Sequence, residues 1–349
     1  MPVSDFTAVP IVDIAPLLAS YDDPEQAAAA HVAVAVELGR AAREVGFLYV
    51  TGGMPPQEVI DGLLGATEAF FALPEADKRR TYIGDSGNHR GYVPIGEEVF
   101  AGGTPDLKEA FDLVPDLPRP DGAAPHPFEG ANRWPDVPGV PFEQAVMRYY
   151  DHVIGVARAL FRGFALALGE PADAFDAHLQ APPSQLRLLH YPADPSRVDR
   201  PGIGAHTDYE CFTLLMATTP GLEVLNGAGQ WIDAPPVDGA FVVNIGDMLQ
   251  TWTNGEFVAT THRVRKVTSE RYSFPLFCSL DYWTVVEPLP RFVDERGPLY
   301  PRVVAGEHIW AQTIQTFTYL RDRLAAGTLE LPDGSHALAA FGRVEAEVG

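Results

Sequence analysis

The stretch GAHTDYECFTLL, from Gly204 to Leu215, sets a histidine and an aspartate two positions apart at the head of an apolar, β-branched and aromatic run. Runs of the same kind recur from about residue 185 and are separated by turn signals: LRLLHY, CFTLLMAT, GLEVL, QWIDA, AFVVNIG and RYSFPLFCSL. The segment Gly227–Gly229 and the pair Asn254–Gly255 are typical of hairpin turns. Strands at this spacing predict a sandwich or a barrel, and a jelly roll fits their number.

Helical patterns flank these strands in the sequence. We expect helices over residues 25–44, 56–72 and 142–168, a short strand near residue 9 and a buried strand at GFLYVTG. In the third helix, apolar residues recur at spacings of three and four, so that one face packs inward. Another helix is expected over 311–327. The prolines of segment 114–141 exclude a regular helix or a central strand, which indicates a long loop that is either functional or a surface strap.

The expected fold class is mixed α/β with a mainly β core: a double-stranded β-helix (jelly roll) with an N-terminal α/β region and a C-terminal helix packed around it. A chain of 349 residues is long enough for one large domain with appendages. We divide it into an N-terminal region, scaffold helices, a jelly-roll core and a C-terminal helical extension, over residues 1–140, 141–180, 181–285 and 286–349.

The charge and the apolar content exclude several classes of protein. The net charge is -22, from 25 basic and 47 acidic residues, which argues against nucleic acid and anionic membranes as partners. No signal peptide or membrane span is evident, so we expect a cytoplasmic protein. Two cysteines cannot make a disulfide framework. Scarce lysine with abundant arginine, alanine, proline and glycine hints at a GC-rich bacterial genome.

The first candidate site is a metal centre. On a strand, residues at i and i+2 point to the same face, so His206 and Asp208 can converge on one ion. His262 is a third candidate, in the run VATTHRV, although a lone histidine there is more typical of a satisfied core residue. Two histidines and one carboxylate form the triad that leaves positions open on Fe(II), whereas a closed structural zinc site takes four protein ligands.

The second candidate site would bind an anion. Arg271 and Ser273 again stand at i and i+2 of an expected strand. A guanidinium and a hydroxyl together suit a carboxylate, because both donate hydrogen bonds to it. Beside a metal, this pair suggests a dicarboxylate that chelates the ion with its other end. Taken alone, Arg271 is more typical of a surface salt bridge.

Together these patterns resemble the iron(II) and 2-oxoglutarate dependent dioxygenases, in the branch that is similar to isopenicillin N synthase. The resemblance runs through VPIVDIAPL, RGYVPIGEE, LKEAFDL and NRWP in the first half of the chain. It continues through AHTDYECFTLL, GLEVLNGAGQWIDAPP, FVVNIGDMLQTWTNGEF, THRV and RYSFPLF. The order His-x-Asp, distal His, Arg-x-Ser is the most specific part.

The resemblance implies roles for particular residues. The expected catalytic iron ligands are His206, Asp208 and His262. Arg271 and Ser273 would hold the distal carboxylate of 2-oxoglutarate, and Tyr191 would add a hydroxyl. Leu189 stands where many members of the family have asparagine. Four further residues are expected near the substrate, with a surface or core position as the alternative: Arg90, Tyr92, Phe111 and Phe277.

The implied activity is that of a 2-oxoglutarate-dependent dioxygenase using Fe(II), 2-oxoglutarate and O2. It would hydroxylate, desaturate or cyclise a small organic molecule at an unactivated C–H bond while 2-oxoglutarate is decarboxylated to succinate and CO2. We expect a role in bacterial secondary metabolism. Two alternatives remain open at this point: a 2-oxoglutarate-independent iron oxidase or oxidative cyclase of the same fold, and a non-enzymatic metal-binding jelly-roll module. Asn244 and Asp247, in NIGD, are expected to shape a turn.

Overall fold

The computed structural model describes residues 3–99, 105–116, 118, 119, 121–193, 202–265, 269–333 and 335. Residues 117 and 120 of the expected strap, and residues 336–349 of the expected C-terminal extension, lie outside this set.

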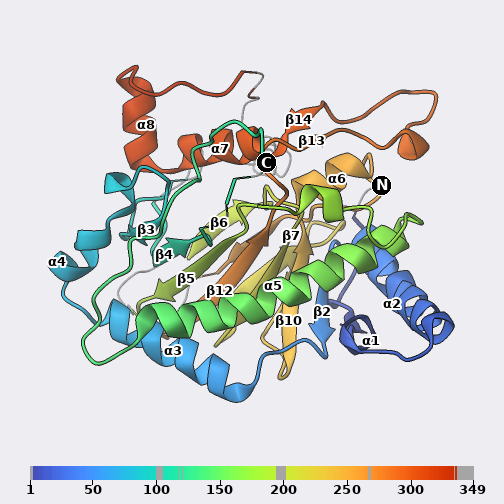
Figure 1. Cartoon of the computed structure of the whole chain (residues 1–349), viewed down its shortest axis with the longest axis horizontal. Coiled ribbons are helices and arrows are strands. Elements are labelled where there is room, and N and C mark those ends of the chain that lie inside the picture. The colour runs from blue at the N-terminus through green and yellow to red at the C-terminus, as the bar shows by residue number, and fades with distance from the viewer. Residues whose placement is uncertain are drawn as a thin grey trace.

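Two sheets build the core (Figure 1). The larger sheet has eight strands, in the order β1 (Ile11–Asp13), β2 (Phe47–Thr51), β10 (Ala240–Ile245), β7 (Phe212–Ala217), β12 (Arg271–Cys278), β5 (Gln185–Tyr191), β4 (Glu109–Leu113) and β3 (Gly91–Val93). The smaller has four, in the order β6 (Ile203–His206), β11 (His262–Val264), β8 (Leu222–Leu225) and β9 (Trp231–Asp233). A separate pair joins β13 (Val285–Val286) to β14 (Val303–Val304). This arrangement confirms the expected jelly-roll core.

The strand pairing is almost wholly antiparallel. Only β1 and β2 run parallel among the pairs of the larger sheet. The strands β1 to β4 come from the expected N-terminal region, and they pair with β10 and β5 of the expected core. The N-terminal region therefore extends the core sheet on both sides. The four-part division of the chain stays a prediction.

Eight α-helices surround the sheets in the described ranges. They are α1 (Ala15–Leu18), α2 (Pro24–Glu44), α3 (Gln57–Phe71), α4 (Glu75–Lys78), α5 (Phe142–Ala167), α6 (Asp247–Trp252), α7 (Ala305–Thr316) and α8 (Thr318–Ala325). Short 3-10 turns are η1 (Arg79–Thr81), η2 (Ile83–Asp85), η3 (Asp176–His178) and η4 (Pro290–Phe292). Among the described residues of 114–141, no helix or strand precedes α5, as the prolines predict.

Helix α5 lies across one face of the larger sheet, with α3 and α2 packed against it (Figure 1). Its buried residues recur every three or four positions, as the sequence predicts. Phe161 and Phe164 contact Phe212 of β7, with ring centroids 4.7 and 5.4 Å apart. Burying aromatic side chains of this size stabilises the fold by about 3 kcal/mol or more each. The helix therefore closes one face of the sheet, and the opposite face is left for the cavity.

The expected hairpin at Asn254–Gly255 is wrong. Helix α6 ends at Trp252, and the pair follows it with φ angles of 52° and 83°. The Gly255 amide donates to the carbonyl of Gln250, 2.8 Å away. Left-handed residues at this place satisfy the carbonyls of a helix end, which explains why the same residue pair suits both structures.

The C-terminal helix also differs from the expectation. It begins earlier, at Ala305, and is interrupted at Phe317, whose backbone is extended. Phe317 forms a β-bridge with Glu98, and the Thr318 amide donates to the carbonyl of Glu97, 2.9 Å away. These backbone bonds to a distant segment replace helical ones and split the helix into α7 and α8.

Among the described residues, none of the helices combines the length and the hydropathy needed to cross a lipid bilayer.

Candidate metal and co-substrate site

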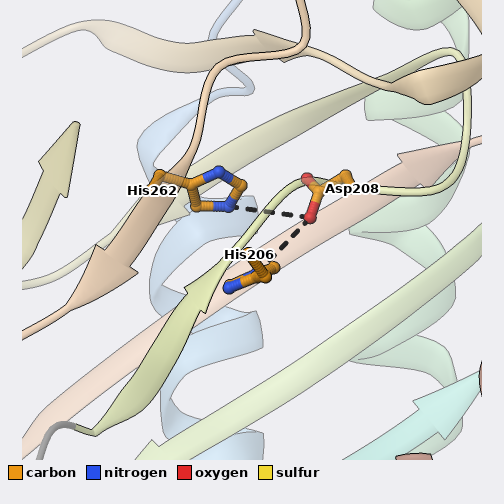
Figure 2. A group of neighbouring side chains, drawn as sticks. All are labelled: His206, Asp208 and His262. Carbon is orange, nitrogen blue, oxygen red and sulfur yellow. Dashed lines mark ion pairs between the residues drawn. The ribbon is translucent and has the colours of Figure 1, made fainter. Parts of the chain in front are cut away.

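The three predicted metal ligands meet at one point of the smaller sheet (Figure 2). His206 ends β6, Asp208 follows it in the next loop, and His262 begins β11. The register of β11 on β6 sets His262 opposite His206. The Nε2 atom of each imidazole lies 3.6 Å from Oδ1 of Asp208. One ligand atom from each residue lies within 4.8 Å of the others, so the three would fit around a single ion.

Backbone carbonyls orient both imidazoles. Nδ1 of His206 lies 2.8 Å from the carbonyl oxygen of Gly204, and Nδ1 of His262 lies 3.3 Å from that of Thr260. When Nδ1 carries the proton and donates it to a carbonyl, the lone pair of Nε2 is left for a metal. Dashed lines in Figure 2 join both imidazoles to the Asp208 carboxylate, through the Nε2 atom in each case.

The Asp208 carboxylate is held through its other oxygen. Its Oδ2 atom accepts a hydrogen bond from Nδ2 of Asn244 at 2.7 Å and another from the Thr213 hydroxyl. Asn244 and Thr213 are direct partners across β10 and β7. The pair fixes the carboxylate so that Oδ1 faces the imidazoles. Asn244 therefore lies in a strand and orients a predicted metal ligand, and the turn-shaping role expected for it is wrong.

The electrostatics suit metal binding. Burial, together with the neighbouring His262, lowers the pKa of His206 to about 4, so that its imidazole is neutral at neutral pH. Burial opposes ionisation of Asp208, but the two imidazoles and the bonds from Thr213 and Asn244 outweigh it and lower the pKa of this carboxyl. Neutral imidazole and ionised carboxylate are the forms that bind a cation.

Arg271 forms a buried cationic site near the triad. It is 1% exposed, and it makes no ion pair with any acid in the described part of the chain. Its guanidinium donates to Oγ of Ser273 at 3.0 Å and to the carbonyl of Thr219 at 3.2 Å. The guanidinium carbon lies 4.8 Å from the ring centre of Tyr191, whose buried hydroxyl makes no hydrogen bond of normal geometry within the described ranges. A buried guanidinium without an acidic partner and a hydroxyl without a hydrogen-bond partner fit the distal carboxylate of 2-oxoglutarate.

A cavity of about 120 Å³ joins the two sites. The larger sheet lines it through alternate residues of β5 and β12, and the smaller sheet closes it with the triad. On β12 the lining residues alternate along the strand and are Arg271, Ser273, Pro275 and Phe277, so Phe277 lies in the cavity wall. Leu189, which replaces the usual asparagine, also lies in this wall.

The other three residues expected near the substrate do not line this cavity within the described chain. The Arg90 guanidinium donates to the carbonyls of Phe128 and Gly130 and so ties down the strap. The Tyr92 hydroxyl donates to Glu109 at 2.6 Å, and Phe111 packs in the core. These contacts do not support a place beside the cavity for the three side chains, and their expected role near the substrate stays a prediction.

Several residues that line the cavity were not predicted from the sequence. Glu98, Lys108 and Arg187 form a buried network at the cavity wall, in which Oε2 of Glu98 lies 2.9 Å from the Lys108 ammonium and 3.0 Å from the Arg187 guanidinium. Burial opposes ionisation of Glu98, but Arg187 and Lys108 lower its pKa to about 2. The run LRLLHY could have indicated Arg187, because alternate residues of a strand point to one face and Arg187 therefore shares its face with Leu189 and Tyr191.

Two family descriptions match the chain. Residues 9–137 match the non-haem dioxygenase in morphine synthesis N-terminal family, and residues 182–280 match the 2OG-Fe(II) oxygenase superfamily. A homoarginine-6-hydroxylase from Oryza sativa subsp. japonica is 36% identical over 90% of this chain and 99% of its own length. A homoarginine-6-hydroxylase from Glycine max is 35% identical over 91% of this chain and 99% of its own.

Solved structures agree with these matches. T7H of Neurospora crassa, crystallised with alpha-KG and thymine, superposes with a TM-score of 0.73 at 25% identity, over 91% of this chain and 97% of that one. A putative 2OG-Fe(II) oxygenase family protein from Caulobacter crescentus superposes with a TM-score of 0.73 at 32% identity, over 92% and 99%. The chain therefore belongs to the 2OG-Fe(II) oxygenase superfamily, in its isopenicillin N synthase-like family, and is a 2-oxoglutarate-dependent dioxygenase that uses Fe(II), 2-oxoglutarate and O2.

Proposed function

We propose that His206, Asp208 and His262 hold the iron of this oxygenase, and that the cavity beside them binds a small molecule for hydroxylation. The observation that carries this proposal is the convergence of the three ligand atoms within 4.8 Å. We further propose that Arg271 and Ser273, with the Tyr191 hydroxyl, hold the distal carboxylate of 2-oxoglutarate. The buried guanidinium without an acidic partner supports that assignment.

With Fe(II) bound, O2 would supply the oxidising power and 2-oxoglutarate two of the four electrons: one oxygen atom enters succinate as CO2 is released, and the other hydroxylates a C–H bond of the substrate. The chain supplies position and exclusion of water. Oδ1 of Asp208 is kept available because Asn244 and Thr213 occupy the other oxygen. Arg271 would compensate the charge of the co-substrate in a site that water hardly reaches.

The names of the relatives support a choice of substrate class. The plant proteins at 34 to 36% identity are named homoarginine-6-hydroxylases. We propose homoarginine as the first compound to test, with hydroxylation as the reaction rather than desaturation or ring closure. Carbon 6 of homoarginine carries the guanidinium group, so oxidation there would place a cation close to the metal.

The proposal is tested with purified protein, Fe(II), 2-oxoglutarate, O2 and homoarginine. We expect substrate-dependent succinate formation and, in anaerobic protein, the weak visible absorption of the 2-oxoglutarate chelate. His206→Ala and Asp208→Ala should abolish both signals. His31→Ala is the matched control, because His31 lies on α2 and does not line the cavity.

Two results would contradict the proposal. Unchanged succinate formation in Asp208→Ala would remove the triad from the iron site. Uptake of O2 that is equal with and without 2-oxoglutarate would favour the 2-oxoglutarate-independent oxidase. The bacterial origin, the role in secondary metabolism and the cytoplasmic location stay predictions, to be checked by the genomic neighbourhood and by fractionation of the source cells.

A further inference from the structure

Two of the residues proposed to hold 2-oxoglutarate stand at the ends of their strands. Tyr191 is the last residue of β5, Arg271 is the first of β12, and the two are the terminal pair of that ladder. Pro192 follows Tyr191 and has no N–H, so it cannot donate to a continuation of the ladder. Since the ends of structural elements open most easily, we expect side-chain contacts at this end of the sheet to fix the spacing of the guanidinium and the hydroxyl.

His190 makes such contacts on the face of the sheet that points away from the cavity. It is 7% exposed. Its Nδ1 atom lies 2.8 Å from Oε1 of Glu109, the first residue of β4, and its Nε2 atom lies 2.9 Å from Oε1 of Glu270, the residue before β12. Because an ionised carboxylate only accepts hydrogen bonds, both ring nitrogens donate. One imidazole therefore bridges the ends of three neighbouring strands, β4, β5 and β12 (Figure 1).

Glu109 attaches this bridge to the rest of the fold. Its Oε2 atom accepts a hydrogen bond from the Lys78 ammonium on α4 and another from the Tyr92 hydroxyl on β3, each at 2.6 Å. Burial opposes ionisation of Glu109, but the bonds from His190, Lys78 and Tyr92 outweigh it and lower the pKa of this carboxyl. The carboxylate therefore remains an acceptor and gives the imidazole a fixed point of attachment.

Tyr272 makes a second link between β5 and β12. It is the direct partner of His190 across the ladder, and its ring stacks on the imidazole with centroids 4.8 Å apart and planes 11° from parallel. The Tyr272 hydroxyl also donates to Oε1 of Glu270 at 3.2 Å. Stacking and hydrogen bonds together therefore fix the imidazole directly behind the pair of Tyr191 and Arg271.

We propose that His190 is a positioning residue for the co-substrate. By bridging the two glutamates at the strand ends, it holds Arg271 and Tyr191 at the spacing that a single carboxylate needs. His190 is not among the described residues that line the cavity, so it acts through these two neighbours. This inference rests on the proposed function, which assigns Arg271 and Tyr191 to 2-oxoglutarate, and it adds a part of that site outside the cavity.

The test is an equilibrium titration of 2-oxoglutarate into the full chain loaded anaerobically with Fe(II), followed by the visible absorption of the chelate. His190→Phe keeps an aromatic ring against Tyr272 but removes both bonds to the glutamates. We expect the dissociation constant for 2-oxoglutarate to rise about tenfold, the change that the loss of one hydrogen bond to a carboxylate would produce. The affinity for Fe(II) alone, measured by equilibrium dialysis, should not change, because the two histidines of the triad lie on the smaller sheet.

A second variant decides the inference if His190→Phe does not fold. The Glu270 side chain is 57% exposed, so Glu270→Ala is expected to fold and to bind 2-oxoglutarate severalfold more weakly. Glu270→Gln should recover part of the affinity, because its amide oxygen can still accept from the imidazole. His152→Phe is the matched control, since Nε2 of His152 lies 3.0 Å from the carbonyl oxygen of Gly53 on another side of the fold, and it should bind 2-oxoglutarate as wild type does.

Three results would overturn the inference. The first is an unchanged affinity for 2-oxoglutarate in His190→Phe, or in Glu270→Ala if the first variant does not fold. The second is an equal loss of Fe(II) affinity, which would indicate a general loss of structure. The third is an equal loss of 2-oxoglutarate affinity in His152→Phe.

The behaviour of wild type separates this inference from the proposed function. A wild type that forms no chelate contradicts the proposed function and the inference with it. A wild type that forms the chelate, beside variants of unchanged affinity, contradicts the inference alone.

Discussion

Removal of the Asn244 amide should weaken iron binding without abolishing the site. Asn244 is 3% exposed, and its Nδ2 donates at 2.7 Å to the Asp208 oxygen that faces away from the imidazoles. A hydrogen bond to a charged group contributes about 1.5 to 3 kcal/mol. At about 1.4 kcal/mol per tenfold change, this corresponds to roughly 10- to 100-fold in affinity, the range typical for groups that orient metal ligands. Thr213 still donates to the same oxygen, so Asn244→Ala should keep a weakened site.

The assay is an anaerobic titration of Fe(II) in the presence of 2-oxoglutarate, followed by the visible absorption of the chelate. We expect the dissociation constant for Fe(II) to rise about 10- to 100-fold, with turnover largely restored at saturating iron. Asn226→Ala is the control, because Asn226 is also buried but donates to the carbonyl of Phe6, far along the chain from the triad. Iron affinity that is unchanged in Asn244→Ala, or equally reduced in both variants, would refute the reasoning.

Three further predictions concern two residues that line the cavity and the glycine packed against the loop of Asp208. Arg271→Ala should raise the KM for 2-oxoglutarate by about 30-fold or more, since truncating one partner of a buried charge pair costs about 2 to 5 kcal/mol; an unaltered KM removes this residue from the co-substrate site. Burial and, as a smaller cause, the nearby Arg187 lower the pKa of His89 to about 3. Neutral His89 therefore contributes stability to the fold above its unfolded pKa of about 6.5, and this contribution is lost as the pH falls. At pH 5 the loss of folding free energy is about 2 kcal/mol. Chemical denaturation of wild type and His89→Asn should show the difference between their unfolding free energies narrowing by that amount from pH 7.5 to 5, and a constant difference would contradict a buried neutral His89. Asparagine is chosen because it tolerates the φ of 56° at this position. In Gly246→Ala a Cβ would lie 2.2 Å from the Glu210 carbonyl oxygen, so the loop carrying Asp208 must shift, and the iron titration should show weaker binding; wild-type affinity would show that the loop tolerates the shift.

The sequence predicted those features that depend on local periodicity. The strands and α5 follow from alternation and from the spacing of three and four. The pair His206 and Asp208 was predicted from positions i and i+2 of one strand, whereas β6 ends at His206 and Asp208 lies in the loop after it. The pairing of His262 with His206 depends on the register of β11 on β6, which no local pattern encodes. It was accessible only through the resemblance to a family. The helix break at Phe317 was missed for the same reason, since its cause is a backbone bond to Glu97.

A physical rule recovers part of what was missed. A lone polar residue inside an apolar strand must be hydrogen-bonded, because an unsatisfied polar group in the core costs about 1 to 3 kcal/mol. Thr213 in CFTLLMAT, Asn244 in AFVVNIG and Arg187 in LRLLHY are such residues, and each lines the cavity. Two of them bind the same carboxylate oxygen, and the third holds Glu98. A polar residue that interrupts the apolar pattern of a strand therefore predicts a position next to a site. Which group that residue binds can be known only from the fold.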